Sequence, residues 1–199
     1  MYTEKPFSQA CENNKQPILE VLRTVLDQPA LVLEIGTGTG QHAVHFASNL
    51  PHLTWQPTDV PGSEKVCLPW LHEYALANVL APLALDVTRE NWPVKKVDAV
   101  FSANTAHIMA WSEVEEMFRG VEAITSAGAS FCLYGPFNYS GRYTSDSNRR
   151  FDESLRAQPG QMGIRDLDDL RALADRTALS LESDMPMPAN NRLLLWRRQ

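Results

Sequence analysis

The sequence predicts an α/β fold in which helices cover both faces of a seven-stranded, mostly parallel sheet. Short apolar runs alternate with longer segments of helical periodicity, which is typical of parallel strands joined by crossover helices. Near the end of the chain, two apolar runs are separated only by MPMPAN at positions 185–190. That connection is too short for a crossover helix, so we expect the last strand to pair antiparallel.

The first predicted element is a helix at 16–26, where apolar residues recur at helical spacing. We place Pro17 in its first turn, where the missing N–H of proline costs little, and treat residues 1–28 as a helical lead-in. The apolar run ALVLEI at 30–35 then predicts a buried strand that leads into closely spaced glycines. The next predicted elements are a helix at 41–50, a strand at 52–59, a helix at 63–78 and a strand at 81–86.

The alternation continues in the second half of the chain. The predicted elements are a strand at 97–104, a helix at 112–124, a strand at 129–135, and two final strands at 179–184 and 191–198. Residues 135–178 are polar and aromatic at first and helical afterwards, and connections of this size often cap a binding site. A hydrophobic content of 44% suits one sizeable core. We therefore predict one domain over residues 1–199, with 135–178 as a cap within it.

Charge and composition narrow the classes of partner. The formal net charge is −6 and the pI is about 5.4, so no basic field exists to recruit nucleic acid. The three cysteines lie far apart without metal-ligand spacing, which predicts free thiols in a reducing compartment and no metal site. No run approaches the roughly 18 apolar residues that span a bilayer. We expect a cytoplasmic protein that is not bound to membranes, and the sequence leaves a homodimer open.

Three glycines follow the first predicted strand in the stretch LEIGTGTGQHAVHFA at 33–47. A dinucleotide fingerprint requires a glycine where Gln41 stands, and a Walker-type loop requires a Gly-Lys-Ser/Thr ending that is absent. Glu34 precedes the glycines, and its charge favours a cationic ligand and repels a diphosphate. S-adenosylmethionine carries a sulfonium and no phosphate, so it fits these residues better. The alternative is that the glycines only make a tight turn between strand and helix.

The stretch VLEIGTGTGQHAVHFA at 32–47 resembles motif I of class I S-adenosylmethionine-dependent methyltransferases, a family with a Rossmann-like sheet. The resemblance implies that Asp59 binds the ribose hydroxyls and that Asp86 reads the adenine amino group, although either could merely cap the next helix. The resemblance also implies that His42 contacts the cofactor, although packing is the commoner role for a histidine at this position of a helix. The full set implied to bind S-adenosylmethionine, and its product S-adenosylhomocysteine, is Glu34, Gly36, Thr37, Gly38, Gly40, Gln41, His42, Asp59, Val60, Asp86, Val87, Ser102, Ala103 and Asn104.

A narrower resemblance covers nearly the whole chain. The segments PFSQACENNKQPILEVL, FSANTAHIMAW, YGPFNYSGRYTSDSNRRFDESLRAQ, GIRDLDDL and MPMPANNRLLLWRR are together similar to the family that includes methyltransferase-like protein 26. Members of that family are presumed methyltransferases. We expect no appended domain or basic groove for a macromolecule, and therefore a small-molecule acceptor.

Methyl transfer needs mainly alignment and desolvation, with a base only if the acceptor carries a proton at neutral pH. We assign catalytic roles to His107, Tyr143 and Asn104, with His107 as the candidate general base. The alternative is that His107 bonds a loop carbonyl or packs on Trp111. The predicted substrate-binding residues are Tyr134, Phe137, Asn138, Tyr143, Asn148, Arg165, Asn190 and Asn191.

Other roles remain open for the substrate-binding set and for the protein as a whole. The asparagines could hold turns, Phe137 could be a core residue, and Arg165 could be a solvated surface residue. Two rival functions also stand beside a methyltransferase. One is a protein that binds the cofactor or its product without catalysis, and the other is a nicotinamide-dependent reductase, which Gln41 disfavours.

Overall fold

The computed structural model describes residues 5–199, which divide into two compact units. The first unit runs to Asp86 and includes Asn91–Phe101; the second comprises Val87–Glu90 and Ser102–Gln199. The sequence predicts a single domain over residues 1–199.

The main sheet has seven strands in the order β3-β2-β1-β4-β5-β9-β8. The strands are β1 (Ala30–Ile35), β2 (Leu53–Asp59), β3 (Leu83–Ala84), β4 (Val97–Ala103), β5 (Thr125–Gly135), β8 (Leu179–Met187) and β9 (Asn191–Arg198). β1, β2 and β3 pair in parallel, and β9 runs antiparallel to both β5 and β8. The predicted α/β class with an antiparallel last strand is therefore confirmed. Among the residues that the structure describes, no helix is long and apolar enough to cross a membrane.

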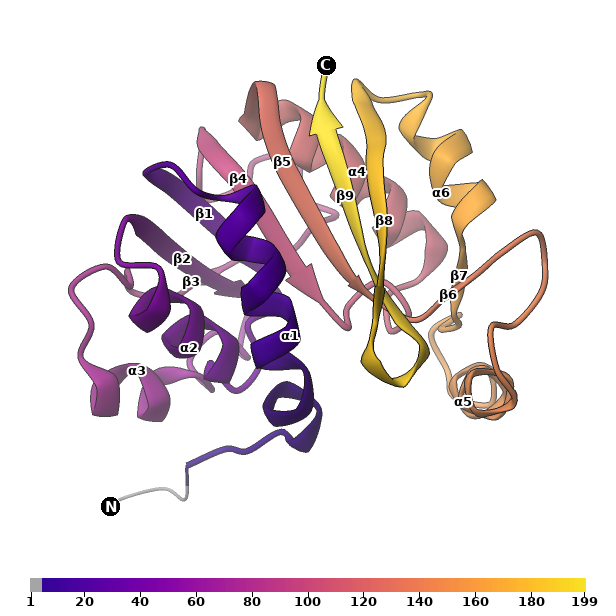
Figure 1. Cartoon of the computed structure of the whole chain (residues 1–199), viewed down its shortest axis with the longest axis horizontal. Helices are drawn as coiled ribbons and strands as arrows, with labels where there is room; N and C mark the ends of the chain where they lie inside the picture. Colours follow the sequence, from indigo (N-terminus) through magenta and orange to yellow (C-terminus); the bar gives the residue numbers. More distant parts are fainter. Residues whose placement is uncertain (1–4) are drawn as a thin grey trace. The chain divides into compact units, whose positions relative to one another are not determined.

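In the first unit, helix α1 (Gln9–Val25) passes in front of β1 in Figure 1. The prediction that Pro17 lies in the first turn of this helix is wrong, because the helix begins at Gln9 and Pro17 lies in its interior. The Ser8 hydroxyl caps the helix by accepting the N–H of Cys11 at 3.3 Å. The first two turns of the helix are polar, so apolar periodicity does not reveal them.

The other two helices of the first unit are α2 (Gln41–Asn49) and α3 (Leu68–Tyr74). α3 is much shorter than the predicted helix at 63–78. Pro69 cannot continue a helix from the preceding residues, so α3 starts beside it, and it ends at Ala75 in a left-handed conformation with φ 46°. Phe46, Trp55 and Phe101 form the aromatic centre of this unit, with ring centroids 5.3 to 5.7 Å apart.

In the second unit, helix α4 (Trp111–Ile124) lies behind β9 in Figure 1. Phe118 of α4 packs edge-on against Phe131 and Trp196, at 5.5 and 5.3 Å between ring centroids. The Pro188–Asn190 turn η1 joins β8 to β9, and Ala189 and Asn190 have positive φ there. This short turn allows the two final strands to pair as predicted.

The segment predicted to be a cap contains α5 (Asp146–Arg156) and α6 (Leu167–Ala174). It also contains β6 (Phe137–Asn138) and β7 (Arg165–Asp166), which pair in parallel as a separate two-stranded sheet. These strands are not foreseen from the sequence, because two residues are too few to show an alternating pattern. Their pairing holds residues 137–138 and 165–166 of the long connection side by side.

Candidate functional site

The glycine loop, residues 36–40, joins β1 to α2 in the first unit. Gly36 and Thr37 both donate their N–H groups to the carbonyl of Thr58 on β2, at 3.0 and 2.8 Å. Gly36, Gly38 and Gly40 all have positive φ, at 77°, 55° and 87°. Side chains disfavour this conformation, so glycine at these positions allows the tight turn between strand and helix.

Two of these glycines differ in what surrounds them. A Cβ added to Gly40 would lie 2.7 Å from the Cβ of Cys67, so the loop packs closely against the residue before α3. A Cβ added to Gly38 would meet nothing within 4 Å. The middle of the loop therefore borders open space, while its end is pressed against protein.

Asp59 ends β2 beside the open part of the glycine loop. Its Oδ2 accepts the N–H of Gly38 and its Oδ1 accepts the N–H of Val60, each at 2.8 Å. The residue is half-buried, and each carboxylate oxygen has a second lone pair that can accept a further hydrogen bond. Asp59 is thus held by the loop and can accept hydroxyl groups from a ligand.

Glu34 lies beneath the loop and is only 1% exposed. Its Oε2 accepts the Thr37 hydroxyl at 2.7 Å and the indole N–H of Trp55 at 2.9 Å. Burial raises the pKa of this carboxyl to about 7, and the negative charge of Asp59 adds to the rise. Glu34 therefore braces the loop from inside, and only the ionised fraction of its carboxyl adds a negative potential under the loop near pH 7.

The raised pKa of Glu34 predicts a pH-dependent stability. Above pH 4.5 the unfolded chain releases the carboxyl proton of Glu34, whereas the folded protein still holds it. The stability that Glu34 contributes through this proton is therefore full below pH 4.5 and is lost as the pH rises through 7. Glu34→Gln keeps an acceptor but cannot ionise, so it should gain up to about 3 kcal/mol of stability relative to wild type across this interval. Urea unfolding between pH 4.5 and 8 measures the difference.

Glu182 provides the control for that experiment, because its hydrogen bond with Arg197 lowers the pKa of its carboxyl. The contribution of Glu182 is fully present above pH 4.5 and is lost only on further acidification, so Glu182→Gln should run parallel to wild type between pH 4.5 and 8. A Glu34→Gln profile parallel to that of wild type would contradict the assignment.

The structure places Gln41 and His42 against α1, in packing positions. Gln41 accepts the N–H of Ser8 at 2.6 Å and donates to Glu12 at 2.7 Å. His42 Nε2 lies 2.6 Å from Asn14 Oδ1, and its ring stacks on Phe46. Burial lowers the pKa of His42 to about 3. Both side chains therefore tie α2 to α1, which is the packing alternative for His42.

The other residues that the resemblance assigns to the cofactor differ in exposure. Val60 is 53% exposed, Asp86 is half-buried two residues after β3, and Val87 is buried. Ser102 is fully buried, with its hydroxyl 2.5 Å from that of Thr105. Ala103 ends β4. Asn104 follows it with φ 59°, and its N–H donates to the Tyr134 carbonyl at 2.9 Å.

His107, the candidate general base, belongs to the second unit and is 6% exposed. Its ring packs edge-on against Phe151 at 5.3 Å between centroids, rather than on Trp111, and its carbonyl accepts the N–H of Gly163 at 2.9 Å. Burial lowers the pKa of the imidazole to about 4, and the charge of Arg165 contributes. The ring is therefore neutral at neutral pH and is a weak base.

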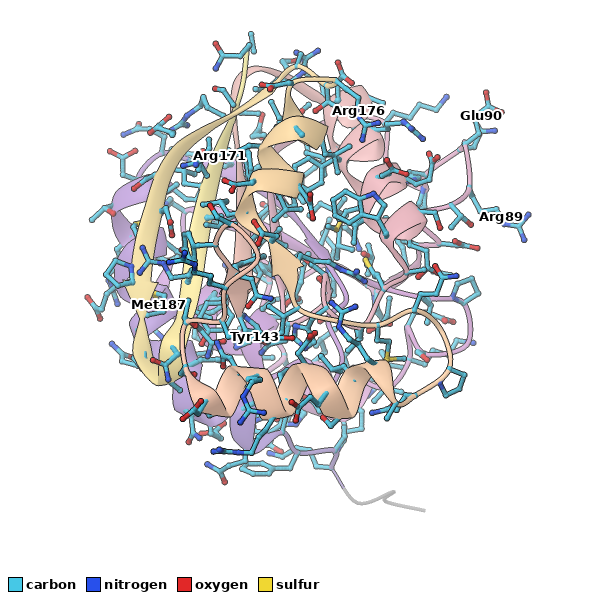
Figure 2. All side chains as sticks on the ribbon, turned by 90° about the vertical axis from the view of Figure 1, so that its right-hand side faces the viewer. Arg89, Glu90, Tyr143, Arg171, Arg176 and Met187 are labelled. Atoms are coloured by element: carbon cyan, nitrogen blue, oxygen red, sulfur yellow. The ribbon has the colours of Figure 1, made fainter. Side chains whose placement is uncertain are left out.

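Tyr143 lies beside helix α5 (Figure 2) and donates its hydroxyl to Asp152 Oδ2 at 2.7 Å. Asp152 is fully buried and also accepts from Arg156 Nε and from the N–H of Ile164, each at 2.6 Å. The hydrogen bond to Asp152 raises the pKa of Tyr143. The phenol is thus oriented by a carboxylate and keeps its proton.

Several predicted substrate-binding residues hold the chain in place. Asn148 donates to the hydroxyl of Thr144 and to the carbonyl of Asn190, and Asn191 donates to the carbonyl of Pro188. This is the alternative in which asparagines hold turns. The buried residues of the set are Tyr134, Phe137 and Asn138, at 2%, 1% and 7% exposure.

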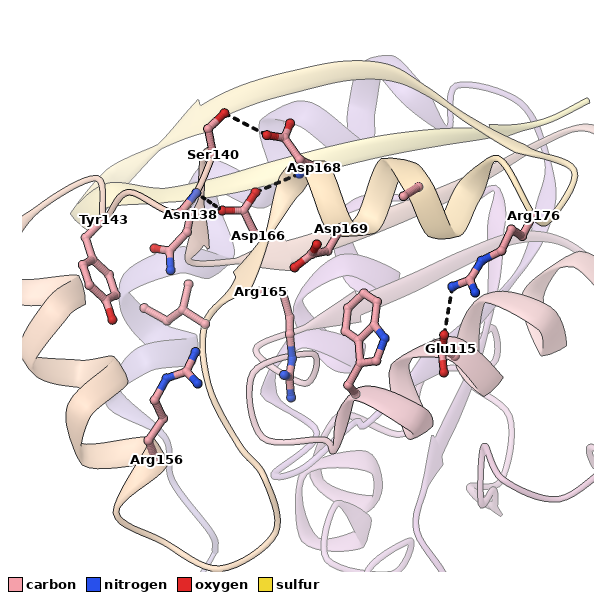
Figure 3. Close-up of a pocket in the computed structure, with 14 residues that line it drawn as sticks. Glu115, Asn138, Ser140, Tyr143, Arg156, Arg165, Asp166, Asp168, Asp169 and Arg176 are labelled. Atoms are coloured by element: carbon pink, nitrogen blue, oxygen red, sulfur yellow. Dashed lines mark hydrogen bonds and ion pairs between the residues drawn. The ribbon is translucent and has the colours of Figure 1, made fainter.

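Arg165 is half-buried rather than a solvated surface residue. It donates to the carbonyls of Ala106 and Met109, so it ties β7 to the loop that carries His107. Asn138, Tyr143 and Arg165 line one cavity of about 1030 Å³ in the second unit (Figure 3).

The family model described as "Protein of unknown function (DUF938)" matches residues 5–198. The chain belongs to this family. The match spans nearly the whole length of this chain.

The fold is that of S-adenosylmethionine-dependent methyltransferases. An O-methyltransferase family protein from Burkholderia thailandensis matches with a TM-score of 0.81 at 16% identity, over 93% of this chain and 56% of that one. An O-methyltransferase family 2 protein from Planctomyces limnophilus DSM 3776 was solved in complex with apigenin. It matches with a TM-score of 0.83 at 14% identity, over 96% of this chain and 58% of that one.

A third match is an O-methyltransferase from neocarzinostatin biosynthesis, solved with S-adenosylmethionine and 2-hydroxy-5-methyl naphthoic acid. Its TM-score is 0.77 at 12% identity, over 96% of this chain and 55% of that one. This DUF938 chain therefore spans a little over half the length of the structures it matches.

Sequence reasoning missed Asp152 and the contact of Cys67 with Gly40. Asp152 and Arg156 are four residues apart on α5, which is the spacing of an ordinary exposed ion pair. Its only distinguishing signal is that Leu155, three residues later, lies on the same buried face. Cys67 carries no local signal, because its contact depends on how the turn before α3 folds back.

Proposed function

We propose that this DUF938 protein is an S-adenosylmethionine-dependent methyltransferase that acts on a small molecule. The observation that carries the proposal is the glycine loop, whose open edge at Gly38 is hydrogen-bonded to Asp59 and braced below by Glu34. Two carboxylates at such a loop oppose a diphosphate and favour a cationic nucleoside. The similarity of most of the chain to the family of methyltransferase-like protein 26 supports the same conclusion.

When bound, the cofactor supplies a methyl group activated by its sulfonium. In the proposed complex, the free lone pairs of Asp59 accept the ribose hydroxyls, and the bare backbone at Gly38 lets the ligand approach closely. Glu34 acts indirectly, through the Thr37 hydroxyl and through its charge. Gln41 and His42 act as positioning residues, because they connect α2 to α1 and so hold the end of the loop.

The acceptor side is assigned to the second unit. His107 is neutral at neutral pH and could take a proton from the acceptor, and Tyr143 could orient the acceptor with a phenol oxygen that Asp152 holds. Asn104, in its left-handed conformation, presents an amide next to the end of β4. We infer a small-molecule acceptor because the acidic charge of the chain opposes a nucleic-acid substrate.

Titration calorimetry of the full chain with S-adenosylmethionine, S-adenosylhomocysteine and NAD tests the cofactor assignment. We expect heat with the first two ligands and none with NAD. Heat with NAD alone would favour the reductase, and no heat with either sulfur nucleoside would refute the proposal.

Asp59→Ala should weaken S-adenosylmethionine binding by about 1–3 kcal/mol, because charge-assisted hydrogen bonds to the ribose are lost. Asp98→Ala is the matched control. Asp98 also accepts a backbone N–H, that of Leu31 at 2.8 Å, but at the start of β4, away from the loop. Asp98→Ala should therefore leave the affinity for S-adenosylmethionine unchanged. Equal affinities for the two folded variants would remove Asp59 from the site.

A second candidate function is binding of the cofactor without catalysis, as a sensor or subunit. The low pKa of His107 and the engagement of Tyr143 with Asp152 favour it, because neither group is poised as a strong base. Incubation with methyl-labelled cofactor and a metabolite extract separates the two functions. A labelled small molecule would establish transfer, whereas tight binding without any labelled product would establish the sensor.

A further inference from the structure

The cavity of about 1030 Å³ in the second unit lies between helix α4, the β6–β7 pair and the first turns of α6 (Figure 3). Trp111 and Ile164 give it apolar walls. Its charged lining residues are Glu115, Arg156, Arg165, Asp166, Asp168, Asp169 and Arg176. Carboxylates therefore outnumber guanidinium groups in the lining, although the difference is small.

The three arginines of the cavity already have partners. Arg156 donates to the buried Asp152 at 2.6 Å, and Arg176 donates to Glu115 at 2.8 Å. Arg165 donates to the Ala106 carbonyl at 2.8 Å and also to that of Met109. The positive charges are thus used to hold the walls together.

Two hydrogen-bond acceptors of the cavity are left over. The Oδ1 of Asn138 is buried and has no hydrogen-bond partner among residues 5–199, although the side chain lines the cavity and is only 7% exposed. Asp169 is exposed, and within the same described range no side-chain hydrogen bond or ion pair reaches its carboxylate (Figure 3). A buried acceptor without a donor is costly, so a ligand that donates would be stabilised there.

The neighbouring acidic groups strengthen this preference. Asp166, which also lines the cavity, accepts the N–H groups of Gly141 and Asp168, at 2.6 and 2.9 Å. Asp168 accepts the hydroxyl of Ser140 at 2.8 Å. Arg165 lies over the Trp111 ring, 6.0 Å from its centroid, which disfavours a second cation at that end. A cation is therefore favoured on the side of Asn138 and Asp169.

We propose that this cavity binds a small organic cation with N–H donors, a primary amine or diamine, through Asn138 Oδ1 and the Asp169 carboxylate. The alkyl part of such a ligand would lie along Ile164 and Trp111. This site goes beyond the proposed methyl transfer, and it is tested without S-adenosylmethionine, so failure of either proposal leaves the other standing.

The test is calorimetry and ¹H–¹⁵N NMR of the full chain with butane-1,4-diamine as the probe. Butane-1,4-diol and succinate are neutral and anionic compounds of the same chain length. We expect the diamine to bind and to shift the Trp111 indole and Asn138 amide signals, with neither control compound doing so. No diamine binding at millimolar concentration, or equal binding of the diol or of succinate, would overturn the proposal.

Two variants separate a specific site from general attraction to an acidic protein. Asp169→Asn should weaken diamine binding about three- to tenfold, whereas Asp175→Asn, the same change at the exposed end of α6 outside the cavity, should have no effect. Asn138→Leu should also weaken binding while preserving thermal stability, because it removes a buried acceptor that has no partner. Equal effects of the two aspartate variants, or unchanged affinity in Asn138→Leu, would reject the site.

Discussion

Replacement of Gly40 with alanine should lower the free energy of unfolding by about 2–5 kcal/mol and abolish binding of S-adenosylmethionine. Two costs combine at this position. Gly40 has φ 87°, which an alanine adopts only with strain, and the new methyl group would lie 2.7 Å from the Cβ of Cys67. Because Gly40 is the N-cap residue of α2, either the glycine loop or the turn before α3 must move.

Gly38→Ala is the matched control for that substitution. Gly38 has φ 55°, but its added Cβ would meet nothing within 4 Å, so we expect a loss of only about 1 kcal/mol. Denaturant unfolding of both variants measures the difference, and calorimetry measures the affinity. If both variants lose equal stability, the contact between Gly40 and Cys67 does not shape the loop. If Gly40→Ala still binds the cofactor as wild type does, the loop is not the site.

Replacement of Asp152 with alanine should destabilise the protein by about 2–4 kcal/mol. Asp152 is fully buried, and its carboxylate accepts from Tyr143, Arg156 and the backbone of Ile164. Arg156 is 61% exposed and can turn to water, but the buried N–H of Ile164 would lose its partner. The loss should disorder the connection between α5 and β7 and loosen one wall of the cavity.

Glu153→Ala is the neighbouring control, since Glu153 is exposed and pairs with Arg149 at the surface. It should change stability by less than about 1 kcal/mol. Burial raises the pKa of Asp152, but its hydrogen bonds with Arg156, Tyr143 and the Ile164 N–H together outweigh burial and lower the pKa. The stabilisation by Asp152 is therefore present at neutral pH and lost on acidification below the ordinary pKa of 3.8. Thermal unfolding at neutral and acidic pH tests both points. An Asp152→Ala variant as stable as Glu153→Ala would show that the buried carboxylate does not hold this region.

The central strands were predictable because their signal is local. β1 matches its predicted range, and β2 and β4 differ from theirs by one residue at one end. Each is a continuous apolar run bounded by polar or turn residues, which is how a strand buried on both faces appears. Elements whose stability depends on partners distant in sequence, such as the polar first turns of α1 and the two-residue strands β6 and β7, were missed.

The residues of the candidate site also differ in whether their role can be predicted from local sequence. The glycine loop and Asp59 could be found because their spacing relative to a strand end is visible in the sequence. Arg165 and Asn148 were expected to face a ligand, yet they donate to backbone carbonyls of other segments. A polar side chain in a loop has many potential partners, and the sequence does not show which carbonyl lies within reach.

The sequence by itself determined the α/β class, the order of the main elements and the glycine turn at the end of the first strand. These depend on hydrophobic periodicity and on backbone conformations open only to glycine, which are properties of neighbouring residues. Only the tertiary structure decided that Glu34 is buried under the loop, that Asp152 gathers three donors, and that Asn138 has an unused acceptor in a cavity. Burial and hydrogen-bond partners arise when segments far apart in the chain pack together, so they become visible only in the folded protein.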